Sequence, residues 1–237
     1  MKRKIIISFI TSIALISFLL LISFGTEMKK SSEKTDVNSL SKKEMQKGWK
    51  LLFDGKTLNG WILDKPDSWI VKDGTISRSG GGYIWTKERF GNFILDLEYK
   101  ISPKCNSGVF IRTADLKDPV QTGIEMQIID SELKKEPGKN DCGSIYDCLA
   151  PSTNAMKSVG EWNRIIITCK DNLINIVMND KKIIDMDLNK WTESNKNPDG
   201  TKNKFNKALK DFSREGYIGF QDHGFPVWFR NVKIKKL

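Results

Sequence analysis

The chain has 237 residues, with 39 lysine and arginine residues against 29 acidic ones, and a formal net charge of +10. Three of the positive charges lie within the first four residues, the others are scattered, and no segment carries the basic and aromatic pattern of an RNA-binding sheet. We therefore expect a solvated surface and no nucleic-acid partner.

Residues 1–26 have the composition of a targeting segment. Lys2, Arg3 and Lys4 precede an apolar run at 5–24 that is interrupted only by Ser and Thr residues. A basic start followed by an apolar run is typical of a secretory signal, and this run approaches the roughly 20 residues that span a bilayer. The sequence predicts export to the periplasm or beyond, with the segment either cleaved or kept as an N-terminal membrane anchor.

The rest of the chain divides into a tether and one domain. Residues 27–47 are rich in Lys, Ser and Glu and offer few large apolar side chains to bury, which predicts a flexible tether. Residues 48–237 suit a single domain with a substantial core. Nothing in the sequence sets the oligomeric state.

Alternating apolar and polar residues recur along the domain, separated by turn signals. Phe93, Leu95, Leu97 and Tyr99 alternate with mostly polar residues, which is typical of a strand with one buried face. Further strands are predicted at 69–71, 75–77, 108–112, 123–129, 162–169, 173–178, 182–186, 217–221 and 227–234, and one short helix at 205–211. Many short strands and almost no helix predict an all-β sandwich or jelly roll.

Seven tryptophans accompany these strands. Trp49, Trp61, Trp69 and Trp162 lie in or beside strand patterns, where a large ring most often fills the core. Trp85 and Trp228 are interpreted either in the same way or as platforms that stack on a sugar ring.

The four cysteines, Cys105, Cys142, Cys148 and Cys169, are expected to be buried or structural. Export would permit disulfides, but connectivity cannot be deduced from sequence. Their spacing lacks the paired form of a zinc site.

Polar side chains gather on two of the predicted strands. The two-residue period places Glu125 and Gln127 on one face of their strand. Asn106 opens, and Arg112 ends, the strand at 106–112. If these strands are neighbours, Arg112, Glu125 and Gln127 would share the concave face of the sandwich. Arg112 could equally be an ion-pair partner of Glu125.

His223 is the only histidine and follows Gln221 and Asp222 in a turn-like segment. Imidazole transfers protons in either direction near neutral pH. His223 is either a hydrogen-bonded turn residue or a proton-transfer group that reaches the same face from this loop.

Five segments together resemble one known family. They read GWKLLFDGKTLNGW at 48–61, NSGVFIR at 106–112, EMQIID at 125–130, GEWN at 160–163 and QDHG with FRN at 221–231. In this order they are similar to the recurring motifs of the 3-keto-disaccharide hydrolase family, also called the 3-keto-glucoside 1,2-lyase/3-keto-2-hydroxyglucal hydratase domain. The resemblance covers 48–237 and implies a concanavalin-like jelly roll that is exported and acts on carbohydrate.

The resemblance implies cleavage of 3-keto-glycosides by β-elimination, by hydration, or by both. A ketone at C3 acidifies the C2 proton, so the reaction needs a base, a donor to the enolate oxygen and an acid for the leaving group. We assign His223 as the base or the acid and Arg112 as the donor to the developing oxyanion. Glu125 is either the partner that sets the tautomer of His223 or the second proton-transfer group. Substrate-binding residues are expected to be Asn106, Gln127, Asp130, Tyr146, Gln221, Asp222 and Trp228.

Other readings of the same residues stay open. No cofactor is required, although a divalent metal held by His223 with Glu125 or Asp222 would be chemically consistent. Glu125 and Asp130 differ in strand parity, which disfavours the carboxylate pair of an ordinary glycosidase. A non-catalytic carbohydrate-binding module of the same fold is the alternative function. A membrane-tethered scaffold is a third.

Overall fold

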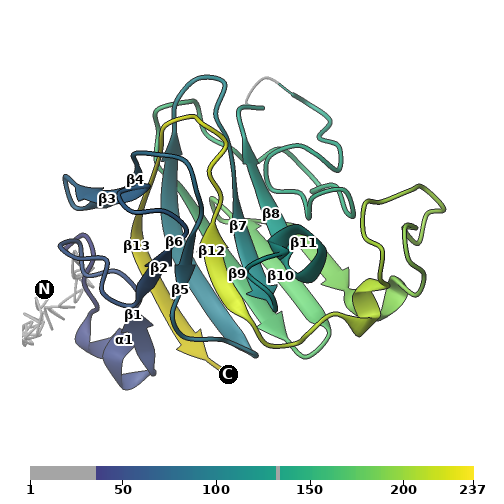
Figure 1. Ribbon diagram of the computed structural model, residues 1–237, viewed down its shortest axis with the longest axis horizontal. Helices are drawn as coiled ribbons and strands as arrows, with labels where there is room; N and C mark the ends of the chain where they lie inside the picture. The colour runs from purple at the N-terminus through teal and green to yellow at the C-terminus, as the bar shows by residue number, and fades with distance from the viewer. Residues whose placement is uncertain (1–35, 132–133) are drawn as a thin grey trace, which may run out of the picture. The chain divides into compact units, whose positions relative to one another are not determined.

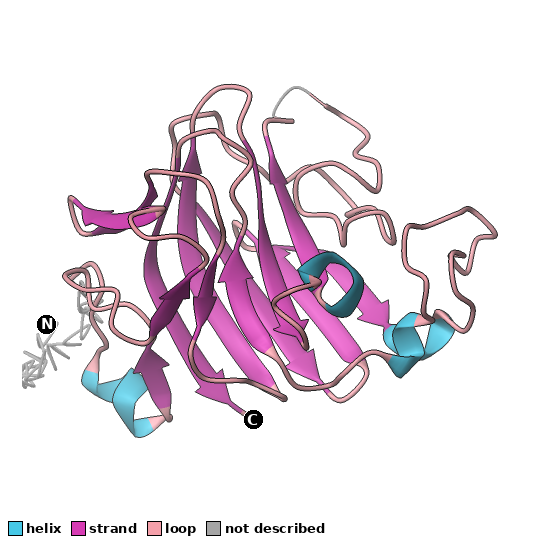
Figure 2. Cartoon of the chain, in the orientation of Figure 1, coloured by secondary structure: helices cyan, strands magenta, loops and turns pink. Residues whose placement is uncertain are grey.

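Antiparallel strands form most of the chain that the structure describes. The computed structural model describes residues 36–131 and 134–237, in which two antiparallel sheets pack face to face (Figures 1 and 2). The eight-stranded sheet has the order β11 (Lys181–Asp187), β10 (Leu173–Met178), β9 (Asn163–Lys170), β6 (Phe93–Ile101), β13 (Val227–Lys236), β4 (Thr75–Arg78) and β3 (Trp69–Lys72), with β1 (Trp49–Leu51) also paired to β13. The five-stranded sheet has the order β2 (Trp61–Leu63), β5 (Ile84–Thr86), β12 (Tyr217–Phe220), β7 (Asn106–Thr113) and β8 (Ile124–Ile129).

The core lies between the two sheets, as the alternating patterns predict. Phe93, Leu95, Leu97 and Tyr99 of β6 are all fully buried. Across the interface, the rings of Phe220 on β12 and Phe229 on β13 stack with centroids 3.9 Å apart. Burying one such large side chain contributes about 1.5–3 kcal/mol, so the core has ample driving force. The all-β sandwich predicted from the sequence is confirmed.

All the predicted strands are present, with boundaries shifted by one or two residues in most cases. Three further strands, β1, β2 and β5, have only three residues each, too few for a period to show. The helix predicted at 205–211 is a single 3-10 turn, η2 (Leu209–Asp211). The other short helices are α1 (Lys42–Gln46), α2 (Pro119–Thr122) and the 3-10 turn η1 (Leu188–Lys190).

Residues 36–47, predicted as part of the tether, are built into the domain instead. Ser41 and Glu44 form a capping box that starts α1, and Glu44 also pairs with Lys233 of β13 at 2.5 Å. The Asn38 backbone donates to Asn231, and its side chain donates to a carbonyl of the β3–β4 turn. The polar composition of this segment predicts a solvated chain and gives no sign of these specific contacts. The predicted signal or anchor at 1–26 lies outside the described residues.

The four cysteines are buried, as expected, and all four are free. Burial raises the pKa of Cys105, Cys148 and Cys169 to about 12, so their thiols are protonated and unreactive at neutral pH. No helix within 36–131 or 134–237 is long and apolar enough to cross a membrane.

Candidate functional site

Glu125 and Gln127 project together from the face of the five-stranded sheet that points away from the core. β7 and β8 are neighbours, with Gly108 opposite Gln127 and Phe110 opposite Glu125. The alternate residues of β8, such as Met126, are fully buried in the core. Gly108 makes room for the carboxyl group, because a Cβ atom there would lie 2.3 Å from Glu125 Oε1. The strand period therefore placed this pair correctly.

The Glu125 carboxyl is nearly buried and stands beside an ammonium group. Its residue is 4% exposed, and Lys204 Nζ lies 3.9 Å from Oε2. Burial raises the pKa of Glu125 to about 7, although Lys204 and the Gln221 amide both lower it. Burial disfavours the charged form of Lys204 as well, and this lowers the pKa of its ammonium group. A carboxyl group with this pKa can accept or release a proton at neutral pH.

Two amides and a phenol complete the group, which we call the Glu125 cluster: Glu125, Gln127, Gln221, Tyr83 and Lys204. The Gln127 amide is satisfied when its nitrogen faces Ser107 O at 3.2 Å and Glu125 Oε1 at 3.3 Å. The Gln221 amide lowers the pKa of both Glu125 and the Tyr83 hydroxyl, whereas burial raises the pKa of Tyr83. The Gln221 Oε1 atom is buried and has no hydrogen-bond partner within the described residues.

An aromatic surface adjoins this cluster on the same face of the sheet. Tyr83 stacks on Phe110 at 5.8 Å, and Trp85 meets the edge of Phe110 at 5.7 Å. Trp85 is fully buried and donates to Asp64 Oδ1 at 3.0 Å, so it supports the site and does not form an exposed sugar platform. The half-buried Tyr83 is the member of the Glu125 cluster that also belongs to this aromatic surface.

Tyr146 and Lys204 come from two loops that hold each other in place. The Tyr146 backbone donates to the Glu125 carbonyl at 2.9 Å, and its ring lies 4.0 Å from Lys204 Nζ. The Lys204 backbone donates to Asp147 Oδ2 at 2.7 Å. Sequence reasoning expected Tyr146 here but missed Lys204, which stands in a Lys- and Asn-rich stretch that reads as solvated surface. It also missed Tyr83, which carries no motif.

Arg112 is not part of this cluster, contrary to the expectation from the sequence. Its guanidinium donates to Gly91 O at 2.9 Å, to Asp171 O at 2.7 Å and to Asn92 Oδ1 at 3.1 Å. The register between β7 and β12 shifts beside Arg112, whose φ is 53°. A bulge of this kind breaks the two-residue alternation and re-aims the side chain. Arg112 therefore joins the two sheets, because its partners flank β6 and β9.

His223 and Asp222 follow Gln221 in an exposed loop. The Asp222 carboxylate accepts from Arg78 Nε at 2.6 Å and from two backbone amides, so it holds the loop in place. His223 is exposed, and its side chain has no hydrogen bond or ion pair within the described residues. It is thus placed two residues beyond the Glu125 cluster, without contact to Glu125.

Asn106 and Asp130 occupy the far end of the β7–β8 pair. Asn106 is half-buried, and its side-chain amide lies 3.1 Å from the Gln127 amide, so it extends the cluster. Asp130 instead accepts from the Lys104 backbone at 2.9 Å, which stabilises the turn before β7. This role leaves Asp130 outside the cluster and removes the carboxylate pair that it might have formed with Glu125.

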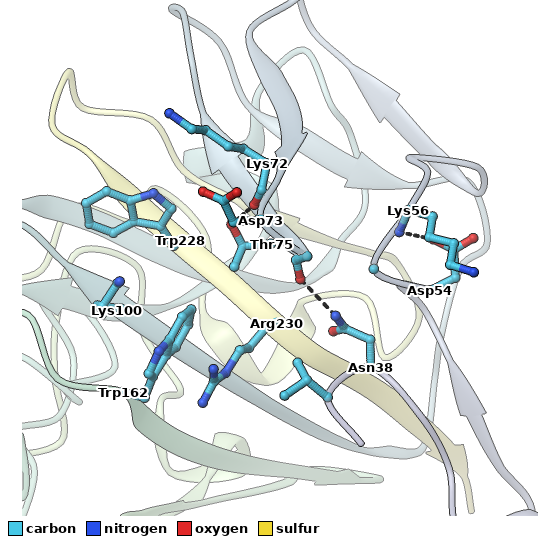
Figure 3. A pocket seen from close by; sticks show the side chains of 13 residues that line it. Asn38, Asp54, Lys56, Lys72, Asp73, Thr75, Lys100, Trp162, Trp228 and Arg230 are labelled. Atoms are coloured by element: carbon cyan, nitrogen blue, oxygen red, sulfur yellow. Dashed lines mark hydrogen bonds between the residues drawn. The ribbon is translucent and has the colours of Figure 1, made fainter. Parts of the chain in front are cut away.

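Trp228 lies on the opposite outer face of the sandwich. It belongs to β13 of the eight-stranded sheet and lines a pocket with Lys100, Trp162 and Arg230 (Figure 3). Its neighbour Phe229 points into the core. Trp162, expected in the core, is half-buried beside Trp228.

In 36–131 and 134–237, no three His, Cys, Asp or Glu side chains are grouped so as to hold a metal ion. The Asp222 carboxylate is already committed to Arg78 and the loop amides. The Glu125 cluster thus presents one proton-transfer group, one cation and several amide and hydroxyl groups, which suits proton abstraction from a polar substrate.

Two sequence comparisons identify the same family. A profile described as the 3-keto-alpha-glucoside-1,2-lyase-like domain matches residues 48–235. The chain is also similar to the 3-keto-disaccharide hydrolase of Bacteroides thetaiotaomicron, with 29% identity over 246 residues, which cover 88% of this chain and 85% of that protein.

Structural comparisons agree with the fold. A candidate glycosyl hydrolase from Parabacteroides distasonis has 36% identity and a TM-score of 0.74, over 80% of this chain and 99% of that one. A second from the same organism has 30% identity and a TM-score of 0.71, over 85% and 99%. A galectin-like protein from Bacillus subtilis, at 13% identity and a TM-score of 0.51 over 74% and 89%, shares the fold alone. The predicted jelly-roll sandwich is confirmed.

Proposed function

The chain belongs to the 3-keto-alpha-glucoside-1,2-lyase-like family, and from this premise we propose that it cleaves the glycosidic bond of 3-keto-glycosides by elimination. The product of elimination is a 3-keto-2-hydroxyglucal, and addition of water at its C1 makes the net reaction a hydrolysis. The similarity to a 3-keto-disaccharide hydrolase supports this substrate class.

The observation that carries the proposal is the Glu125 carboxyl, buried to 4% exposure with its pKa raised to about 7. In the proposed reaction the carboxylate removes the proton from C2 of the sugar. The electron pair of the C–H bond moves into an enolate across C2, C3 and the C3 oxygen. The enolate then reforms the ketone and expels the oxygen on C1, and the leaving group takes up a proton. A base with a pKa near the working pH suits this step.

Lys204 and the amides have supporting roles in this scheme. The Lys204 ammonium, 3.9 Å from Glu125, is placed to stabilise negative charge that develops on the enolate oxygen. Gln127 and Gln221 orient the carboxyl and offer polar contacts to sugar hydroxyls. We retain His223 as the proposed proton donor to the leaving group, because its loop continues directly from Gln221.

We also propose that the chain is exported and that its N-terminal segment either anchors it or is removed. The basic start and the apolar run at 5–24 support this proposal. Periplasmic or extracellular placement would bring the enzyme to oligosaccharide substrates.

The test compares the 3-keto form of a disaccharide with the unoxidised disaccharide. The full-length chain, kept in solution with a polyoxyethylene detergent, is assayed for enone absorbance and reducing-sugar release, with and without a chelator. We expect turnover of the keto-sugar alone. Glu125→Gln should lower kcat/KM by at least about 100-fold, as loss of a general base does.

Glu88→Gln is the matched control, since Glu88 is exposed and pairs with Lys236 on another surface. It should retain full activity. His223→Ala tests the leaving-group role and should slow substrates with poor leaving groups most. Binding of glycans without any product from keto-sugars would instead support a carbohydrate-binding module.

A further inference from the structure

We propose that the outer face of the eight-stranded sheet holds a second saccharide site, which is separate from the Glu125 cluster and selects an anionic sugar of the uronic-acid class. This site is the tryptophan pocket, lined among others by Trp162, Trp228, Lys100, Arg230, Lys56 and Lys72. The inference does not depend on the proposed reaction, because a binding site on this face needs no turnover.

The pocket is a built concavity of about 740 Å³ (Figure 3). Its floor is the sheet itself, where alternation along β13 points Trp228 and Arg230 outward while Phe229 enters the core. The β3–β4 turn and the loop at 54–56 form its wall. A volume of this size accommodates one or two sugar rings.

The floor combines indole rings with cations. Lys100 Nζ lies 4.9 Å from the Trp228 ring centroid and 5.1 Å from that of Trp162. The Arg230 guanidinium lies 3.9 Å from the Trp162 ring, and its Nε donates to Glu98 at 2.6 Å. The rings hold both cations at fixed positions on the sheet. Arg230 is neutralised by Glu98, whereas Lys100 is not neutralised.

Charge complementarity favours an anionic ligand. Lys56, Lys72 and Lys100 form no ion pair within the part of the chain that the structure describes. The two acidic lining residues, Asp54 and Asp73, are outnumbered by these three lysines, so the lining keeps a net positive charge once Arg230 is paired with Glu98. A ligand carboxylate at Lys100 would supply the missing counter-charge.

A sugar carrying that carboxylate fits the remaining surface. The Trp228 side chain is half-buried and offers flat apolar area to the C–H face of a pyranose, whereas the Arg230 guanidinium covers one face of the Trp162 ring. Asn38 and Thr75 at the opposite wall use their side-chain polar atoms within the chain, so ligand recognition in this pocket depends on the ring surface and the lysines. An anionic pyranose would therefore use the ring stack and the lysine charge together.

Isothermal titration of the full-length chain in a polyoxyethylene detergent tests the proposal. The probe is an oligogalacturonate, and the fully methyl-esterified oligomer of the same length is the neutral comparison. We expect the acid form alone to bind, more weakly as salt rises. Lys100→Met and Trp228→Ala should each weaken binding by about tenfold, the loss that one desolvated cation–π or stacking contact implies.

Lys181→Met is the matched control, since Lys181 is exposed on β11 outside the pocket, and it should bind as the unaltered chain does. Thermal unfolding of each variant reports whether it is folded. Equal binding of the esterified oligomer, or unchanged affinity in a folded Lys100→Met variant, would overturn the proposal. Loss of oligogalacturonate binding in Glu125→Gln would also overturn it, because the acid sugar would then occupy the Glu125 cluster. Inactivity toward keto-sugars leaves this measurement unaffected.

Discussion

The proposed reaction depends on one carboxyl group, that of Glu125, and the surroundings of this group set its pKa. Burial between β8, Gly108 and the Tyr146 loop disfavours the charged form of Glu125. Lys204 and Gln221 favour the charged form, so the pKa of Glu125 rises only to about 7. The proton affinity of this base therefore depends on a lysine that arrives from a loop almost 80 residues further along the chain.

Removing the Lys204 charge should move the pH profile to higher pH. Lys204→Gln leaves the carboxyl buried without its nearby cation, which raises the pKa of Glu125 above 7. Because the carboxylate is the active form, the rise of kcat/KM with pH should shift to the alkaline side, and activity at pH 7 should fall. Lys207→Gln, at an exposed neighbour, is the control. An unchanged or acid-shifted profile would contradict the prediction that Lys204 lowers the pKa of Glu125.

The same raised pKa has a consequence for stability. Glu125 titrates near 4.5 in the unfolded chain and near 7 when folded, so the folded state binds its proton more tightly. The stability from this group is complete below pH 4.5 and is lost as pH rises through 7. The free energy of unfolding of Glu125→Gln, relative to that of the unaltered chain, should therefore rise by up to roughly 3 kcal/mol as the pH goes from 4 to 8. Urea unfolding at both pH values measures the gain, and a constant difference would contradict the raised pKa.

At the scale of elements, β7 and β8 act as one frame for the site. Their direct pairing places Gly108 under the Glu125 carboxyl, where a side chain has no room. Gly219 of β12 similarly leaves space for the Trp85 ring, since a Cβ atom there would lie 2.1 Å from Trp85 Cε3. The site therefore depends on glycines within strands, at positions where glycine otherwise weakens a sheet.

A methyl group at position 108 should displace the base without unfolding the sheet. In Gly108→Ala the new Cβ atom meets Glu125 Oε1 at 2.3 Å and Cγ at 2.9 Å, so the carboxyl must move. A displacement near 1 Å costs about 100-fold in rate, so kcat/KM should fall by that order. Gly91→Ala, whose nearest contact would be an ordinary 3.5 Å, should keep its activity. Full activity in Gly108→Ala would show that the carboxyl position is not critical.

The sequence predicted these elements well and the site only in part. Period-two patterns located the long strands and placed Glu125 and Gln127 on one face. The bulge at Arg112 could not be predicted, because a single residue with φ of 53° reverses a side chain without a local sequence signal. Lys204 was missed for another reason: its contact with Glu125 depends on how two loops pack against each other, and composition in those loops indicates only solvent exposure.

For the whole molecule, the contacts that matter are those that fix one sheet against the other. Arg112 makes such a contact, since it starts on β7 of the five-stranded sheet and ends at residues flanking β6 and β9 of the eight-stranded sheet. Burial lowers the pKa of this guanidinium, yet all three of its nitrogens are hydrogen-bonded, so it remains charged.

Arg112→Met should separate this structural role from the catalytic role that the sequence suggested. Methionine keeps much of the side-chain volume but leaves the Gly91 and Asp171 carbonyls without their donors, which should cost about 3 kcal/mol in the free energy of unfolding. Urea unfolding measures this loss, and kcat/KM is measured below the unfolding transition. Because the guanidinium does not reach the Glu125 cluster, folded Arg112→Met should keep its pH profile and most of its activity. A large fall in kcat/KM with unchanged stability would instead require Arg112 to contact the substrate, and the sheet-joining geometry would then have to differ in the working enzyme.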